Sequence, residues 1–420
     1  MRRLHPDTLA FTLLLGALGA LPPLSIDMAL PALGHIAASL HRSIGDVTLT
    51  LSLFMAGFSS AQLLFGPLSD RYGRRPVLLA GCALFALASL ACAVAPSLES
   101  LLAARFAEGC GAGAGMVMVF AMVRDLFDGH GARTKLSYVN LVLGVAPMIA
   151  PTLGSWILAL LPWPAIYATL AVGGLILTLA VWLGLAESLP APDTGALDLG
   201  RVAGNYRRVL GHRLAFGYIL INGLAFGCMF AYVSGSSFLM IQLLGLSAGH
   251  YALTFACTAL GIMAGAFISG RLSQHHIAAT VPLGLGLGGA ALGSGLLAAL
   301  TLAGAPSLGL FLPLLVLTTL CYGLIAPNAA HGALHPLPEI AGVAGASLGF
   351  TQMAGGALAS ALVAELNDGR TILSMTATMT LFAVAAVLAY VLMVLPAERR
   401  HEEAAAAEER EMALAGLEEG

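Results

Sequence analysis

Three ionisable residues stand in otherwise apolar stretches of this 420-residue sequence: Asp27, Arg105 and Glu108. An ionised acid at the centre of a membrane costs about 2.5–3.5 kcal/mol on insertion scales, and intramembrane acids usually mark an ion or substrate pathway. Asp27 is therefore either a proton-binding acid or a structural acid that a hydroxyl or an arginine satisfies. Arg105 is expected at the same depth as Asp27, so a contact between them is geometrically allowed, and its alternative role is a structural ion pair. Glu108 follows one helical turn later and is either a second proton site or the partner of Arg105.

A second group of charges occupies the segment Gly66-Pro-Leu-Ser-Asp-Arg-Tyr-Gly-Arg-Arg-Pro76. Its two glycines permit a tight turn and a close approach of helices, while one acid and three arginines form a charge cluster at the membrane face. Ion pairs of this kind hold a gate shut when formed and release it when broken. The alternative is a basic loop that only sets topology. The gate residues expected here are Gly66, Asp70, Arg71, Gly73, Arg74, Arg75 and, at the end of another apolar run, Asp125.

Prolines and glycines recur at helical spacing in one apolar run, as Gly144, Pro147, Pro151 and Gly154. Proline removes a backbone hydrogen bond and kinks a helix, and glycine admits a close neighbour. This run is expected to act as a rigid gating helix, and ordinary glycine-mediated packing is the alternative. Pro22 and Pro23 are expected to bend the first apolar run near Asp27.

Neutral polar residues are the remaining candidates for contact with a substrate. Asn222, Asn328 and Gln352 lie in apolar runs of the second half of the chain. They are interpreted as cavity-lining groups, with hydrogen bonding between helices as the alternative.

The composition requires a membrane environment for these residues. Apolar residues make up 58% of the chain and charged residues only 10%, against roughly 25% in ordinary soluble domains. Each spanning helix needs about 20 apolar residues, so the apolar content supports roughly a dozen spans. The runs do not alternate in polarity, which excludes a transmembrane barrel. The expected spans are 8–36, 46–66, 76–95, 97–123, 134–158, 164–186, 212–240, 248–270, 278–303, 307–330, 341–365 and 371–395.

The basic residues predict the orientation. With both termini cytoplasmic, sixteen of the nineteen lysines and arginines fall on the cytoplasmic side, as the positive-inside rule requires. The polar stretch 187–213 separates two sets of six spans. The expected parts are an N-terminal six-helix bundle (1–186), a cytoplasmic linker (187–211), a C-terminal six-helix bundle (212–395) and an acidic cytoplasmic tail (396–420).

An internal repeat relates the two sets of spans. Gly57, Gly66, Leu68 and Ser69 each have an identical residue 204 positions later. Two repeated bundles with a binding site between them are typical of transporters.

The charged segment 66–76 resembles the loop signature of the major facilitator superfamily. The segments 24–31, 105–111 and 144–154, together with Arg124-Asp125 and Pro327-Asn328-Ala329, resemble motifs of the twelve-helix drug:proton antiporters. The likeness covers residues 8–395 and is greatest to the bicyclomycin/chloramphenicol-resistance (Bcr/CflA) group. It implies drug efflux, proton coupling and alternating access, a functional role for Arg105 in the cavity, and a cytoplasmic charge latch. Glu108 departs from the glutamine that is commoner in this group, which leaves the proton stoichiometry open.

We therefore expect an all-α membrane protein of two pseudo-symmetric six-helix bundles that exports small apolar or amphipathic compounds, chloramphenicol-like or bicyclomycin-like. The expected partners are the small-molecule substrate, protons and the lipid bilayer, with no nucleic acid; a monomer in the bacterial inner membrane would suffice. No nucleotide-binding, nucleophile or metal-ligand motif is present, and the loop pair His275-His276 lacks supporting ligands, so no cofactor or metal is expected and energy would come from the proton gradient. The alternatives are a sugar or metabolite transporter on the same fold, a membrane-embedded enzyme and a sensor without flux.

Overall fold

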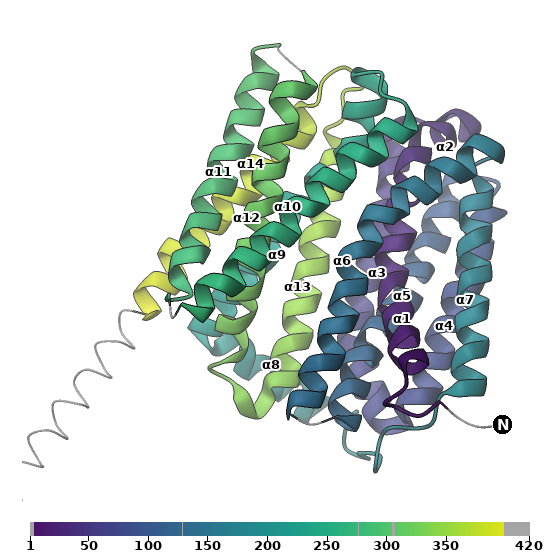
Figure 1. The fold of residues 1–420 in the computed structure, drawn as a ribbon, viewed down its shortest axis with the longest axis vertical. Coiled ribbons are helices and arrows are strands. Elements are labelled where there is room, and N and C mark those ends of the chain that lie inside the picture. The colour runs from purple at the N-terminus through teal and green to yellow at the C-terminus, as the bar shows by residue number, and fades with distance from the viewer. Residues whose placement is uncertain (1–3, 128, 276, 305–306, 399–420) are drawn as a thin grey trace, which may run out of the picture.

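The computed structural model describes residues 4–127, 129–275, 277–304 and 307–398 (Figure 1). Within these ranges no strand occurs, and twelve helical segments are long and apolar enough to cross a membrane. The predicted all-helical, twelve-span fold is thereby confirmed. The α-helices are α1 (Leu9–Asp27), α2 (Leu33–Leu40), α3 (Ile44–Tyr72), α4 (Arg74–Ala93), α5 (Leu98–Leu126), α6 (Gly129–Leu160), α7 (Pro164–Gly184), α8 (Leu199–Gly211), α9 (Arg213–Ser237), α10 (Ala248–Gln274), α11 (Thr280–Leu302), α12 (Leu308–Leu334), α13 (Ala341–Glu365) and α14 (Leu373–Ala389). Short 3-10 turns are η1 (Leu30–Ala32) and η3 (Pro338–Ile340), and π-helical turns are η2 (Phe238–Leu243) and η4 (Tyr390–Val394).

The helices form two groups that stand side by side, purple to teal on one side of Figure 1 and green to yellow on the other. In the first group α5 packs on α3 and α4, α7 packs on α4, and α1 packs on α6. In the second group α9 packs on α13 and α14, and α12 packs on α10 and α11. The groups meet where α3 contacts α13 and where α6 contacts α10.

The α-helical part of the first span extends past the two prolines and ends at the acid. Helix α1 continues through Pro22 and Pro23 and ends at Asp27, after which the chain passes through η1 into α2. The α-helix is therefore interrupted directly after the acid, within the first candidate span, Leu9–Leu40. Discontinuous helices of this kind line binding sites in transporters.

The charged segment expected to be a loop is mostly helical. Helix α3 extends to Tyr72, and α4 begins at Arg74, so Gly73 alone joins them, with a φ of 98° that a side chain disfavours. A methyl group on Gly66 would meet no atom within 4 Å, so the expected need for glycine holds at Gly73 and not at Gly66.

Close helix crossings occur at equivalent places in the two halves. A methyl group on Gly57 of α3 would lie 2.1 Å from the carbonyl oxygen of Phe106 on α5. Its repeat partner Gly261 on α10 faces α12, where the added methyl would lie 2.6 Å from Oγ1 of Thr319. The sequence repeat therefore corresponds to a repeated packing contact.

The two halves also approach closely at the end of the molecule where α2 lies (Figure 1), called here the α2 end. A methyl group on Gly45 of α3 would lie 2.7 Å from the carbonyl oxygen of Ala364 on α13. The Ser155 hydroxyl on α6 lies 3.1 Å from the carbonyl oxygen of Ala248 on α10, and its proton is shared with the nearer carbonyl oxygen of Pro151 at 2.7 Å. Main chains of the two halves are thus almost in contact here.

The domain boundaries stay a prediction, although the polar stretch between the halves does contain α8, and α9 starts at Arg213. Most of the predicted tail 396–420 lies outside the described residues. The same holds for Arg2, Arg3, Arg399, Arg400, Arg410 and His276, on which parts of the orientation and loop analysis rest.

A paired substitution tests the packing of α3 against α5. A methyl group on Gly109 of α5 would lie 2.0 Å from the carbonyl oxygen of Phe54, whereas one on Gly288 of α11 meets nothing within 4 Å. We expect Gly109→Ala to lower the free energy of unfolding by at least about 1–3 kcal/mol, the usual cost of overpacking. Gly288→Ala should leave it equal or slightly higher, because alanine favours helix more than glycine does. Thermal unfolding of the two purified variants checks this, and equal midpoints would contradict the close contact.

Candidate functional site

Arg105 lies at the centre of the first helical group and its side chain is completely buried. Its Nη1 donates to Oε2 of Glu108 at 2.6 Å and to Oγ of Ser25 at 2.7 Å. The guanidinium lies over the rings of Phe54 and Tyr167, with centroids 4.5 and 5.6 Å away. These contacts compensate the loss of hydration that a buried charge suffers.

Glu108 has partners for both carboxylate oxygens. Oε1 accepts hydrogen bonds from the hydroxyls of Ser25 at 3.0 Å and Ser89 at 2.8 Å. Oε2 accepts from Arg105 and, at 3.7 Å, from the thiol of Cys92. Of the two roles considered for Glu108, the structure shows it as the ion-pair partner of Arg105.

Asp27 is not joined to Arg105, contrary to the contact that equal depth allowed. Arg105 reaches the neighbouring residue Ser25 and pairs with Glu108 instead. The Asp27 side chain is 5% exposed, and no described residue forms a hydrogen bond or an ion pair with its carboxyl group. The turn η1, which follows Asp27, contacts α9 of the other half. Asp27 is therefore a buried acid without a partner, at the boundary between the halves.

The glycine- and proline-containing run, with Pro147 and Pro151 inside α6, packs directly against this boundary. A methyl group on Gly154 would lie 2.2 Å from the carbonyl oxygen of Met28, the residue after Asp27. Gly144 faces Met263 of α10, where the added methyl would make ordinary contacts at 3.9 Å. Gly154 thus accommodates the interruption of α1, and α6 links that interruption to the second half.

The predicted latch is assembled around Arg74, which is almost completely buried. Arg74 forms ion pairs with Asp70 at 2.5 Å and with Asp125 at 2.8 Å, and Nη1 donates to Oγ of Ser69. The remaining members point elsewhere: Arg71 donates to the carbonyl oxygen of Thr194 at 2.7 Å and Arg75 to that of Trp182 at 2.7 Å. All these partners belong to the first half or to the linker, so the latch does not span the two halves in this conformation.

Glu187 is a member of this cluster that the sequence did not indicate. Its carboxylate accepts the backbone N–H groups of Arg74 at 2.9 Å and of Arg75 at 3.1 Å, at the start of α4. An anion stabilises the N-terminus of a helix, so Glu187 fixes the junction at Gly73. The linker adds a bond from the N–H of Asp193 to the carbonyl oxygen of Asp70 at 2.9 Å. The pKa of Asp193 is held below its ordinary value by the N–H of Gly195 and by Arg201.

The neutral polar residues bond between helices. Asn222 on α9 donates to Gln352 on α13 at 3.3 Å, and Gln352 donates to the Tyr322 hydroxyl on α12 at 3.3 Å. Asn328 donates to Ser269 on α10 at 2.7 Å. Asn222 and Gln352 therefore form one network with Tyr322, and Asn328 is separate from it.

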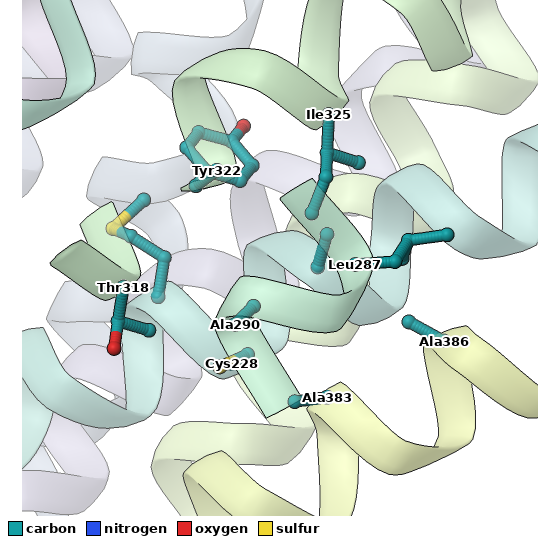
Figure 2. A pocket seen from close by; sticks show the side chains of 10 residues that line it. Cys228, Leu287, Ala290, Thr318, Tyr322, Ile325, Ala383 and Ala386 are labelled. Carbon is teal, nitrogen blue, oxygen red and sulfur yellow. The ribbon is translucent and has the colours of Figure 1, made fainter. Parts of the chain in front are cut away.

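A small apolar void lies beside that network, inside the second half (Figure 2). Its volume is about 10 Å³, and the ring of Tyr322 forms part of its wall. A space of this size holds about one water molecule, so it is a packing defect and not a drug site. Its walls come from α9, α11, α12 and α14.

Comparison with known proteins places this architecture in a family. Residues 15–360 match the model of the Major Facilitator Superfamily. An MFS-type transporter of Bacillus subtilis, YdgK, is 40% identical over 268 residues, which is 63% of this chain and 66% of the relative, just under two thirds of its length. The bicyclomycin resistance protein homolog of Haemophilus influenzae is 30% identical over 387 residues, covering 91% of this chain and 96% of that protein. The multidrug resistance protein MdtL of Escherichia coli is 32% identical over 359 residues, covering 84% and 88%.

Solved structures agree at the level of the fold. A bacterial homolog of the human lysosomal transporter Spinster, solved in an inward-facing and unoccupied conformation, matches with a TM-score of 0.71 and 16% identity. The match covers 91% of this chain and 95% of that one. From the family match, the relatives and the twelve spans together, this chain belongs to the major facilitator superfamily and is a multi-pass membrane transporter.

Proposed function

We propose that this chain is a proton-coupled exporter of small apolar or amphipathic compounds, working by alternating access in the inner membrane of a bacterium with both termini cytoplasmic. The observation that carries the proposal is Asp27, a buried acid without a hydrogen-bond or ion-pair partner, at the point where the first helix is interrupted and the following turn η1 contacts the other half. The names of the relatives, bicyclomycin resistance and multidrug resistance, support drugs as the substrate class.

The burial of Asp27 supplies a mechanism. In this conformation the α2 end is closed and the acid is sequestered, which favours its neutral, proton-loaded form. When the halves separate, water and substrate reach the carboxyl group. Hydration then lowers the free-energy cost of the ionised form. A proton and a substrate then stabilise different conformations, which is the requirement for antiport. No cofactor is needed, because the proton gradient supplies the energy.

Arg105 and Glu108 have a supporting role in this proposal. Each oxygen of Glu108 already has two partners, and the pair neutralises itself inside the first half. A group held this way fixes α5 against α1 and α4, and Asp27 remains the acid that exchanges its proton.

The first test uses proteoliposomes with an imposed pH gradient, to which chloramphenicol and the lipophilic cation tetraphenylphosphonium are added separately. We expect at least one compound to dissipate the gradient through the wild type, and Asp27→Asn to abolish this leak because an amide cannot carry the proton. The exposed Asp7→Asn, at the start of α1, is the matched control and should behave as wild type. Full coupling in Asp27→Asn would refute the assignment. A leak caused by a sugar or another metabolite, and by no drug, would keep the fold and overturn the substrate class.

The variant Glu108→Gln tests whether Glu108 is only the structural ion-pair partner of Arg105 or also an acid that couples to proton transport. We expect the variant to keep the compound-driven proton leak, because Asp27 is intact, and to lose roughly 3 kcal/mol of stability, because Arg105 becomes a buried unpaired charge. The leak in proteoliposomes and the thermal unfolding midpoint are measured on the same preparation. Loss of coupling at an unchanged midpoint would make Glu108 a second proton site.

The latch gives a further expectation. Glu187→Gln removes the negative charge at the N-terminus of α4 and should cost about 1 kcal/mol there, exposing the Gly73 junction. Trypsin, which cleaves after Arg71 and Arg74, should cut the detergent-purified variant severalfold faster than wild type. Glu339→Gln removes an exposed carboxylate that pairs with Arg208 and serves as the control. Equal cleavage rates for the two variants would show that Glu187 does not fix the junction.

A further inference from the structure

The first part of the linker is bound to the first half at the junction of α3 and α4. The N–H of Asp193 donates to the carbonyl oxygen of Asp70 at 2.9 Å, and the carbonyl oxygen of Thr194 accepts a hydrogen bond from Arg71 at 2.7 Å. The carboxylate of Glu187 adds its bonds to the start of α4. This part of the linker therefore moves with the first half.

The last part of the linker is helix α8, and it is bound to the second half. Helix α8 packs on α9 and α13, at the end of the molecule opposite to the α2 end, called here the linker end (Figure 1). The side chain of Val209 on α8 is completely buried. Arg208 pairs with Glu339 of η3 at 3.1 Å, directly before α13. Helix α8 therefore moves with the second half.

Two consecutive turns lie between these attachments. The N–H of Ala196 donates to the carbonyl oxygen of Asp193 at 3.1 Å, and that of Asp198 donates to the carbonyl oxygen of Gly195 at 3.0 Å. The first and fourth Cα atoms of such a turn are less than about 7 Å apart. Fully extended, the chain from Asp193 to Leu199 would span about 20 Å. The turns therefore store chain length that the linker could release.

An ion pair closes the chain around these turns. Arg201, in the first turn of α8, donates from Nη1 to Oδ2 of Asp193 at 2.7 Å. The other oxygen, Oδ1, accepts the N–H of Gly195 at 2.9 Å. Among the described residues, Asp193–Arg201 is the one ion pair between α8 and the part of the linker that is bound to the first half. The pair thus joins the two attachments directly and keeps the linker short.

This ion pair is the weakest connection in the series. Its two side chains are 59% and 44% exposed, and an exposed pair shifts an equilibrium by no more than about fivefold. The attachments on either side combine several backbone hydrogen bonds or a buried side chain. When the halves separate at the linker end, tension in the chain therefore acts first on Asp193–Arg201 and on the turns that it encloses.

We propose that residues 193–201 form a strap between the two halves, and that the Asp193–Arg201 pair sets its length and so limits how far the halves separate at the linker end. This rests on the alternating access of the proposed function, in which the linker end is the cytoplasmic end. Asp193 and Arg201 are positioning residues for this movement and do not contact the substrate.

The test measures the separation directly, without a transported compound. Spin labels are attached at Leu9→Cys on α1 and Ile277→Cys after α10, two exposed positions at the linker end, with the six native cysteines replaced by alanine. Pulsed electron paramagnetic resonance in nanodiscs gives the distances between the labels. The ratio of widely separated to narrowly separated molecules reports the state of the strap.

The decisive variant is Arg201→Gln, which removes the ion pair and leaves the turn of Asp193 intact. We expect the wide-to-narrow ratio to rise roughly two- to fivefold, because one exposed ion pair no longer opposes the separation. Raising the salt concentration from about 0.05 M to about 1 M should raise the ratio of the wild type in the same direction, because salt screens exposed charges. The same change of salt should have little effect on Arg201→Gln.

Two controls separate the ion pair from other effects on α8. Arg201→Lys keeps a positive charge within reach of Asp193 and should retain most of the wild-type ratio. Arg207→Gln removes an exposed arginine of the same helix that has no ion pair among the described residues. It should leave the ratio unchanged.

The outcomes distinguish the strap from the proposed function. Equal ratios in Arg201→Gln and the wild type, with narrow and wide distances present in both, would overturn the strap and leave alternating access intact. A salt response that persists undiminished in Arg201→Gln would also overturn it, because the response would then come from other charges. A single distance in every variant and at both salt concentrations would reject alternating access and the strap with it. The compound-driven proton leak through Asp27 is measured independently and decides the coupling.

Discussion

The buried Arg105–Glu108 ion pair is the constraint on which the first half is built. A guanidinium without water needs a counter-charge, hydrogen-bond acceptors and polarisable rings, and here they come from four helices: Glu108 on α5, Ser25 on α1, Phe54 on α3 and Tyr167 on α7. Helix α3 must come close to α5 to place its ring there, which explains the glycines at 57 and 109, where an added methyl would lie 2.1 and 2.0 Å from a carbonyl oxygen of the facing helix. The tight crossing and the buried charge are two aspects of one arrangement.

This pair also determines what is left for Asp27. If Glu108 were neutral, Arg105 would be a buried charge without a counter-charge. Glu108 supplies the counter-charge of Arg105 from the same helix, and Asp27 forms no ion pair among the described residues. In the proposed function, the departure of residue 108 from the pattern commoner among resembling proteins assigns the structural ion pair to Glu108 and leaves proton exchange to Asp27.

Much of the fold could be predicted from the sequence, because span number depends on long apolar runs and these are a property of composition. The three charged residues were found for the same reason, since charge inside such runs stands out. The sequence could not decide whether Arg105 pairs with Asp27 or with Glu108. The depth of a residue in the membrane fixes one coordinate only and leaves the rotation of each helix about its axis undetermined. The end of α3 was missed because apolarity stops at the membrane face, whereas hydrogen bonding continues to Tyr72. Glu187 was missed because it acts 113 residues away in sequence, on a backbone N–H that no side-chain pattern reveals.

The two ends of the molecule are controlled by different physics. At the α2 end the contact is steric and short-ranged: Gly45 lies against the main chain of α13, and Ser155 lies against the start of α10, so closure depends on small residues and on the shape of the interrupted α1. At the opposite end the named contacts are ionic and lie within the first half and the linker, around Arg74. A steric contact is lost abruptly when the halves separate, whereas an ionic cluster can exchange partners as they move. In the proposed function, protonation of Asp27 beside the steric contact is the more effective way to couple an ion to the movement, because a buried charge costs most where the surfaces must fit closely.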